Sequence, residues 1–372
     1  MRKSRLIVRD LTFDGFRNLH PGRWEPNEGV NILYGDNAQG KTNLLEACWL
    51  FTGGRSFRGA KDSDLVGFGR EEAKLSMQFY AGRRDQEAAI TIKGRRQATL
   101  NGVTLPSAAK LAGNFCGVVF APDHLSLIKD GPDERRRFID AAICQLKPGY
   151  IATLSEYQKA LAQRNAFLKQ SRVQYSHLPA QAQEMLELWN YTLAVTGTKI
   201  TRARQQYLRR LESVAREIYD GLTGGKESIH LELSSPALAD SPEETARIWQ
   251  AQLKASLPAD FAAGFTTVGP HREDLAVQVN GNAVKKYGSQ GQTRSAVLAL
   301  KLAEAQLLQE ILKEPPVLFL DDVMSELDPS RQDYILNHIE GWQVFITCCE
   351  PSTALKNTAA KVFSVKQGVI SE

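Results

Sequence analysis

The chain has 372 residues, of which 42% are hydrophobic and 24% charged, values typical of a globular protein with a large core. No segment approaches the ~20 consecutive apolar residues of a membrane span, and charges interrupt the apolar run of the basic N-terminus, which argues against a signal peptide. The five cysteines lack metal-ligand spacing and are odd in number, so we expect a reducing, cytoplasmic location. Because no apolar segment could span a membrane, we expect no membrane partner.

Positive charge is concentrated in one region, although the net charge is only +4. Residues 135–226 contain 15 Lys and Arg against seven Asp and Glu. Such an excess attracts phosphate backbones, but a solvated helix face would have the same composition.

The first predicted elements surround a glycine-containing loop. Residues 5–13 alternate as in a strand, residues 30–34 form a short apolar strand, and residues 41–50 have the pattern of a helix packed on a sheet. The loop matches G-x-x-x-x-G-K-[ST], with the residues Gly35, Asp36, Asn37, Ala38, Gln39, Gly40, Lys41 and Thr42. Backbone N–H groups of such a loop surround a polyphosphate, the lysine contacts the outer phosphates, and the threonine hydroxyl binds Mg²⁺. A chance match would not be expected between a strand and a helix, so the sequence predicts a nucleotide site.

Antiparallel strands are predicted after this helix. The sequence predicts a meander of strands at residues 73–81, 87–93 and 96–105, and Asn101-Gly102 is a hairpin signal. A short strand at 118–120 follows.

Residues from 132 onward are predicted to be helical. Heptad spacing recurs in two segments, at Leu154, Leu161 and Leu168, and then at Leu186, Leu193, Ile200, Tyr207 and Val214. Two such segments joined by a loop around Pro179 predict an antiparallel helical hairpin. We then expect a strand at 229–233, a helix at 243–257 and a hairpin turning at Asn280-Gly281.

The C-terminal part adds two further motifs. Ser289, Gly291 and Gln292 open a long predicted helix, where serine is a good N-cap and glycine lets an anion approach closely. The next apolar strand, 317–320, ends in Asp321-Asp322. Asp321 is expected to hold Mg²⁺ with Thr42, and Asp322 to orient or deprotonate the attacking water. Strands at 342–347 and a hairpin at 361–370 complete the chain.

The order of these motifs resembles the signature, Walker B and D-loop of ABC-type ATPases. In that class the signature of one subunit closes on the ATP that another subunit holds, and its helix N-terminus and serine take the place of an arginine finger. The resemblance implies catalytic roles for Lys41, Asp322 and Ser289. It also implies that Ser289, Gly291 and Gln292 contact the ATP held by a second copy.

A closer resemblance is to the RecF family, whose heads are SMC-like with a shortened helical arm. Seven segments carry it, namely FRNL at 16–19, GDNAQGKTNLLEA at 35–47, GRSFRG at 54–59, PDHLSLIKDGPDERRRFID at 122–140, GPHRED at 269–274, GSQGQTRS at 288–295 and FLDDVMSELD at 319–328. The resemblance implies a cytoplasmic protein that binds ATP and DNA, dimerises on ATP and hydrolyses it slowly. It also implies that the protein acts with RecR and RecO at gaps between single- and double-stranded DNA, where it helps RecA to load. Roles in DNA repair, replication and the SOS response follow from the same resemblance.

Further site residues follow from the same resemblance. Arg17 and Asn18 lie where related heads touch the nucleotide. The other interpretation is that they are ordinary polar residues exposed at the end of a strand. The basic loop with Arg55, Arg58 and Lys61 is the first choice for DNA contact. Turn residues Arg83, Arg84, Arg95 and Arg96 are the second choice. No role is assigned to His271 or Arg272.

Three features depart from the wider ABC pattern. Thr347 stands where many of these ATPases have a histidine, the second Walker B acid is Asp322 instead of glutamate, and residues 121–123 lack a Q-loop glutamine. All three favour slow hydrolysis.

The fold class expected is α/β, an ABC-type ATPase head with a mixed sheet, an antiparallel meander and an inserted helical hairpin. We expect the head to comprise residues 1–131 and 261–372, and the helical arm residues 132–260. Two alternatives to an ATP-gated DNA-binding dimer stay open. One is a nucleotide-gated scaffold without functionally important hydrolysis, and the other is a transporter's nucleotide-binding subunit, which the hairpin and the missing Q-loop disfavour.

Overall fold

The computed structural model describes residues 5–174, 180–350 and 359–372. The chain divides into two compact units, the first formed by Met1–Leu127, Val214–Ser228 and Ser289–Glu372, and the second by Ile128–Ser213 and Ile229–Gly288. Residues 261–288 thus lie in the unit with the helical arm, whereas we expected them in the head. The reason is strand pairing, because β10 (Asp274–Val279) pairs antiparallel with β9 (Ile229–Ser234).

A mostly parallel sheet forms one layer of the first unit. Its strand order is β15 (Val369–Ser371), β14 (Ala360–Lys366), β3 (Val30–Tyr34), β13 (Val344–Cys348), β12 (Val317–Asp321) and β8 (Gly117–Phe120). All neighbours are parallel except β14 and β15. Strands β12, β13 and β8 are buried throughout, which explains their continuous apolar sequences. The carboxyl ends of β3, β12 and β13 meet at one edge, where ligands of such sheets bind.

The predicted meander is confirmed as a second, antiparallel sheet. Its order is β2 (Gly22–Trp24), β1 (Ile7–Asp14), β4 (Ala73–Ala81), β5 (Arg84–Lys93), β6 (Arg95–Leu100) and β7 (Val103–Thr104). The strand predicted over 96–105 is broken at Asn101 and Gly102, whose φ angles of 50° and 80° make the turn between β6 and β7.

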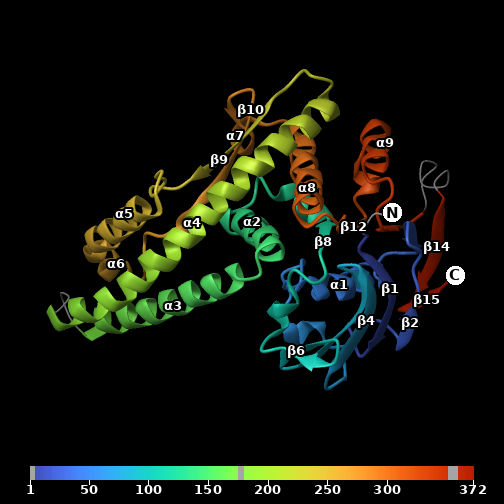
Figure 1. Ribbon diagram of the computed structural model, residues 1–372, viewed down its shortest axis with the longest axis horizontal. Coiled ribbons are helices and arrows are strands. Elements are labelled where there is room, and N and C mark those ends of the chain that lie inside the picture. Colours follow the sequence, from blue (N-terminus) through green and yellow to red (C-terminus); the bar gives the residue numbers. More distant parts are fainter. Residues whose placement is uncertain (1–4, 175–179, 351–358) are drawn as a thin grey trace. The chain divides into compact units, whose positions relative to one another are not determined.

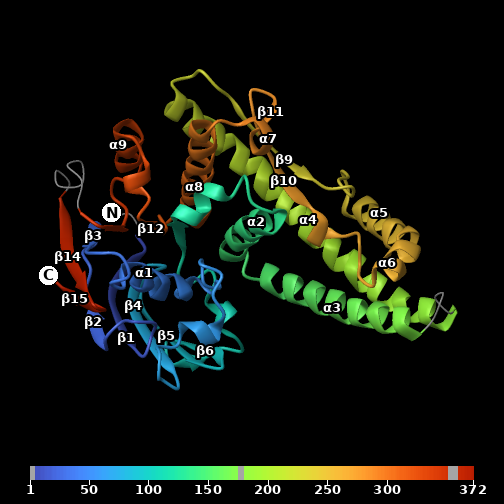
Figure 2. The same cartoon turned by 180° about the vertical axis from the view of Figure 1, so that it is seen from behind.

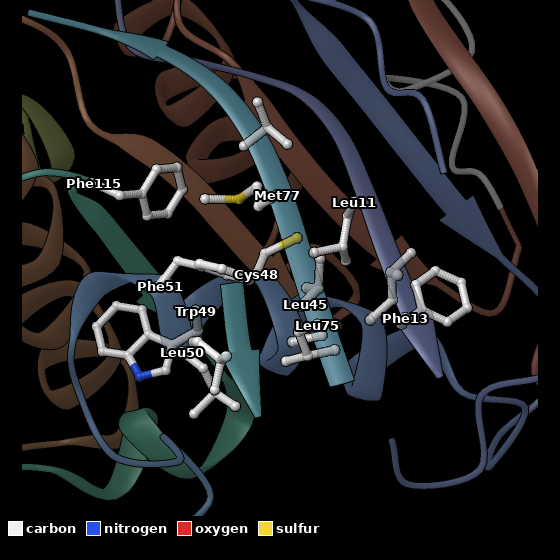
Figure 3. Packing of buried hydrophobic residues seen from close by; sticks show 14 of the residues in the cluster. Leu11, Phe13, Leu45, Cys48, Trp49, Leu50, Phe51, Leu75, Met77 and Phe115 are labelled. Carbon is white, nitrogen blue, oxygen red and sulfur yellow. The ribbon is translucent and has the colours of Figure 1, made fainter. Parts of the chain in front are cut away.

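Helix α1 (Lys41–Trp49) joins the two sheets in one hydrophobic core. In Figure 3, Leu45 and Cys48 of α1 lie beside Leu75 and Met77 of β4. The same cluster includes Phe345 of β13. The core therefore holds the start of α1 and, with it, the glycine loop at residues 35–42. The other long helices of this unit are α8 (Gln290–Leu312) and α9 (Pro329–His338).

The second unit contains the predicted helical hairpin. Helices α3 (Tyr150–Gln174) and α4 (Ala180–Thr223, which reaches into the first unit) run in opposite directions and converge toward Gln174 and Ala180 (Figures 1 and 2). The heptad residues of α4 are buried, as predicted, from Leu186 to Val214. The loop expected around Pro179 lies outside the described residues.

Shorter elements complete this unit. They are α2 (Pro132–Leu146), α5 (Pro242–Ala255), α6 (Leu257–Ala263), α7 (Val284–Tyr287) and β11 (Asn282–Ala283). The helix predicted over 243–257 therefore ends at Ala255, and a second helix starts after Ser256. Among the described helices, none combines the length and apolar character needed to cross a membrane.

Candidate nucleotide site

The glycine loop has the backbone geometry that its sequence predicts. Gly35, Ala38 and Gly40 all have positive φ angles, of 146°, 64° and 115°. A Cβ on Gly35 would lie 2.3 Å from the carbonyl oxygen of Val365, so only glycine fits there. Gly40 is the N-cap of α1, and this leaves the N–H groups of the first helical turn directed at the loop.

Lys41 is held inside this loop. Its ammonium donates hydrogen bonds to the carbonyl oxygens of Gly35, at 2.5 Å, and Asp36, at 2.8 Å. The side chain is 7% exposed. A cation in this position would meet the outer phosphates of a bound nucleotide.

The remaining loop residues are fixed by their neighbours. The carbonyl oxygen of Ala38 accepts a hydrogen bond from the Asn18 amide at 3.0 Å, and that of Gln39 accepts one from the backbone N–H of Gly368 at 2.8 Å. Asn37 contacts the Cys349 thiol at 3.3 Å. The loop is therefore braced from three directions, which limits the reorganisation needed to bind a ligand.

Asp321 meets Thr42 at the carboxyl ends of the parallel strands. The Thr42 hydroxyl donates to Asp321 Oδ1 at 2.8 Å, and the Thr347 hydroxyl donates to the same oxygen at 2.7 Å. Burial raises the pKa of Asp321 above its ordinary value, while the hydrogen bonds from Thr347 and Thr42 and the charge of Arg58 oppose that shift. A hydroxyl and a carboxylate within 2.8 Å of each other are hard oxygen donors of the kind that fit Mg²⁺.

Thr347 has a larger part in this site than its sequence position suggested. Its hydroxyl also accepts the backbone N–H of Asp322 at 2.9 Å, and its carbonyl oxygen accepts the same N–H at 3.2 Å. Asp321 and Thr347 are neighbours in the parallel register of β12 and β13. The sequence signal that could have located Thr347 is this shared strand-end position.

Asp322 is held in an uncommon backbone conformation, with a φ angle of 51°. The Ser325 hydroxyl donates to the Asp322 carbonyl oxygen at 2.8 Å and to its carboxylate at 3.2 Å. Positive φ at a residue other than glycine persists only where the surroundings stabilise it, and such residues concentrate at functional sites.

Arg17 and Asn18 point to different partners. Asn18 contacts the loop through Ala38 and also accepts from Asn43 at 2.7 Å. The Arg17 guanidinium instead donates to both carboxylate oxygens of the buried Glu46, at 2.9 and 3.1 Å. Only Asn18 of this pair is brought to the phosphate loop by a hydrogen bond.

The signature residues form a helix start at which Ser289 is exposed and Gly291 and Gln292 are half-buried. The Ser289 hydroxyl accepts the backbone N–H of Gln292 at 3.1 Å, and the Gln292 side chain accepts that of Ser289 at 2.9 Å. Gln292 also donates to Glu227 at 2.7 Å. A Cβ on Gly291 would lie 3.9 Å from Arg331 Nη2 and 3.9 Å from Ser289 Oγ, which is ordinary van der Waals contact. In the described part of the chain, no hydrogen bond joins these residues to the loop at 35–42.

Comparisons with known proteins agree with this geometry. The family described as "RecF/RecN/SMC N terminal domain" matches residues 7–371. The "DNA replication and repair protein RecF" of Ruminiclostridium cellulolyticum is 38% identical, over 92% of each chain. That of Lachnoclostridium phytofermentans is 37% identical, over 99% of this chain and 100% of its own.

This chain belongs to the RecF family.

Solved structures extend the comparison to the fold. The recombination mediator protein RecF bound to ATPrS in the RecFOR pathway has a TM-score of 0.91 and 35% identity, covering 99% of this chain and 98% of its own. An Smc head domain from Pyrococcus furiosus, at 17% identity, has a TM-score of 0.54 and covers 98% of this chain and 95% of its own, so it supports the fold alone. The predicted ABC-type head with a helical insert is confirmed for this RecF-family chain.

The basic loop of the RecF-family chain lies beside the start of α1. Arg55, Arg58 and Lys61 are exposed, and the Arg58 guanidinium donates to Asn43 at 3.0 Å. Of the second set of arginines, Arg96 is instead paired with Asp62 at 2.9 Å.

His271 and Arg272 lie within the second unit. The Tyr157 hydroxyl is 2.6 Å from His271 Nδ1, and the carbonyl oxygen of Thr266 is 3.1 Å from Nε2. Burial lowers the pKa of His271 to about 4, so the ring is neutral at pH 7. The Arg272 guanidinium lies 5.2 Å from the Phe265 ring centre. These contacts are ones that stabilise the fold of this unit.

Proposed function

We propose that this chain is an ATP-dependent DNA-binding protein of recombinational repair, with roles in DNA replication and the SOS response. The observation that carries the proposal is the hydrogen-bonded set of Thr42, Asp321 and Thr347 beside a braced phosphate loop. Solved relatives in the RecFOR pathway hold ATP or ATPrS, which supports ATP as the nucleotide.

ATP binds in the loop from Gly35 to Thr42. The backbone N–H groups and Lys41 contact its phosphates, and Asn18 keeps the loop in its binding conformation. Thr42 and Asp321 hold Mg²⁺, which neutralises charge on the phosphates when it is bound. Binding requires Asp321 to be ionised, and its raised pKa means that Mg²⁺ binding weakens as the pH falls.

A second copy completes the site. Ser289, Gly291 and Gln292 begin a helix of 23 residues whose N-terminus is exposed, and an exposed helix N-terminus attracts anions. Each copy therefore places its signature against the γ-phosphate that its partner holds, and ATP drives formation of the homodimer.

Hydrolysis is slow in this scheme. Asp322 orients the water, but Ser325 bonds to its carboxylate and Thr347 restrains its backbone. The same restraint favours a second candidate, a nucleotide-gated scaffold in which turnover has no function. An ATPase rate that falls in Asp322→Asn supports catalysis, and an unchanged rate supports the scaffold.

DNA contact is assigned to Arg55, Arg58 and Lys61. Their loop borders α1 through the Arg58–Asn43 hydrogen bond, so occupancy of the ATP site can alter phosphate contacts. In this proposal the dimer acts at junctions of single- and double-stranded DNA, with RecR and RecO, to help load RecA.

The test is binding to a gapped duplex with ATP, with ADP and without nucleotide, at about 50 and 200 mM salt. We expect ATP to tighten binding, and binding to weaken steeply with salt because phosphates are contacted. Lys41→Arg should lose the effect of ATP. Binding of equal strength in all three nucleotide conditions would contradict the proposal.

A further inference from the structure

Phe68 is the most exposed large hydrophobic residue among those described. Its relative exposure is 108%, so the whole ring is in solvent. The side chain therefore adds nothing to the core, and a large aromatic surface left fully in water calls for another explanation.

A hydrogen-bonded turn carries this ring. The backbone N–H of Arg70 donates to the carbonyl oxygen of Gly67 at 3.0 Å, and Gly69 has a φ angle of 75°. A Cβ on Gly67 would lie 2.7 Å from the carbonyl oxygen of Arg17. The turn thus requires glycine on both sides of Phe68.

The turn is anchored to the core of the first unit. Gly67 donates its N–H to the carbonyl oxygen of Gly15 at 2.7 Å, and Val66 forms an antiparallel bridge with Phe16. The Arg17 backbone N–H donates to Leu65 at 2.9 Å, while its guanidinium bonds to Glu46 of α1. The turn that carries the ring is therefore linked to α1 through Arg17, whose backbone bonds to Leu65 and whose side chain bonds to Glu46.

Four exposed cations lie along the same segment. Arg55, Arg58, Lys61 and Arg70 are exposed, and within the described residues none of them forms an ion pair. Of the four acids between them and β4, Asp62 is paired with Arg96 and Glu72 with Lys74, which leaves the exposed Asp64 and Glu71 against the four cations. The segment thus combines available positive charge with one fully exposed aromatic face.

We propose that Phe68 stacks on an unpaired base of single-stranded DNA, while the nearby cations contact the flanking phosphates. This inference rests on the proposed function and assigns part of its DNA specificity. Sites for single-stranded nucleic acid combine an aromatic face with a basic surface, and every base offers a face for stacking. Bases inside a duplex are already stacked, so Phe68 distinguishes a gap from intact duplex.

The test uses a gapped duplex with 2-aminopurine in the gap, because stacking quenches the fluorescence of that base. We expect wild type with ATP to quench it, and Phe68→Ala to bind the gapped DNA about 5- to 150-fold more weakly, without quenching. Phe68→Trp should restore both. Val103→Ala, which removes another exposed apolar side chain, should behave as wild type.

Three results would overturn the inference. Phe68→Ala could bind and quench like wild type, while the response to ATP is intact, and then the proposed function survives alone. Phe68→Ala could weaken binding to intact duplex by the same factor as binding to gapped DNA, which would show an effect that is not specific to unpaired bases. It could also lose ATP-driven dimerisation in sedimentation, which would make Phe68 a contact between copies. If wild type bound no DNA at all, both proposals would fail together.

Discussion

At the scale of single residues, the site depends on a buried carboxylate that is expensive to ionise. Asp321 accepts two hydroxyl hydrogen bonds, yet burial still leaves its pKa raised. Because the folded state binds this proton more tightly than the unfolded state, the free energy of unfolding falls as the pH rises from the ordinary value of 3.8 through the raised pKa. Above that window the ionised carboxylate destabilises the protein unless a cation is bound.

Asp321→Asn should therefore stabilise the protein while removing its function. Asparagine can still accept both hydroxyl hydrogen bonds, but it carries no charge to bury. At pH 7.5, without nucleotide or Mg²⁺, we expect Tm to rise by a few degrees in calorimetry, and Mg²⁺-dependent ATP binding to be lost. Asp322→Asn is the control and should change Tm less. A lower Tm in Asp321→Asn would contradict this account of the site.

At the scale of elements, buried arginines join the helices of the second unit. Arg204 of α4 donates to both carboxylate oxygens of Asp140 on α2, at 2.9 and 2.7 Å, and to Glu273 at 2.8 Å. Glu273 also accepts from Thr201 at 2.5 Å and from Ser235 at 2.7 Å. Every charge in this network is paired, so removing one member leaves others buried without a partner.

Arg204→Met should destabilise the protein by about 3–5 kcal/mol, measured by urea unfolding. The loss comes from the unpaired carboxylates of Asp140 and Glu273. Arg210→Met, at an exposed position of the same helix, is the matched control and should stay within about 0.5 kcal/mol of wild type. Equal effects of the two substitutions would mean that the network adds nothing beyond helix packing.

At the scale of the whole molecule, the proposed ATP site is shared between two copies. The phosphate loop and the signature start belong to the same compact unit. Among the residues described, no hydrogen bond connects them within one chain. Two defective variants should then complement each other, because each lacks a different half of the site.

Lys41→Arg should not bind ATP productively, and Ser289→Arg should bind ATP without dimerising. When they are mixed with ATP, we expect dimers in sedimentation, built from the intact loop of the Ser289→Arg copy and the intact signature of the Lys41→Arg copy. Each variant alone should stay monomeric. ATP-driven dimers of Ser289→Arg alone would reject the composite site.

The sequence by itself determined the features that are local along the chain. The loop at 35–42 specifies its own conformation because glycines and their neighbours set the backbone angles within eight residues. Apolar runs and heptads likewise identified the parallel strands, the meander and the helical hairpin, since each pattern follows from the repeat of its own backbone.

Only the tertiary structure decided which distant side chains meet. In the sequence, Thr347 was notable only because many ABC-type ATPases have a histidine at that position. The parallel register of the strands makes it the hydrogen-bond partner of Asp321, 26 residues away. Arg17 and Asn18 are adjacent, yet one bonds to Glu46 and the other to the phosphate loop. The full exposure of Phe68 also could not be predicted from the sequence, because an apolar residue is ordinarily expected to be buried. The physical reason is that burial and pairing depend on how remote segments pack, which no short stretch of sequence encodes.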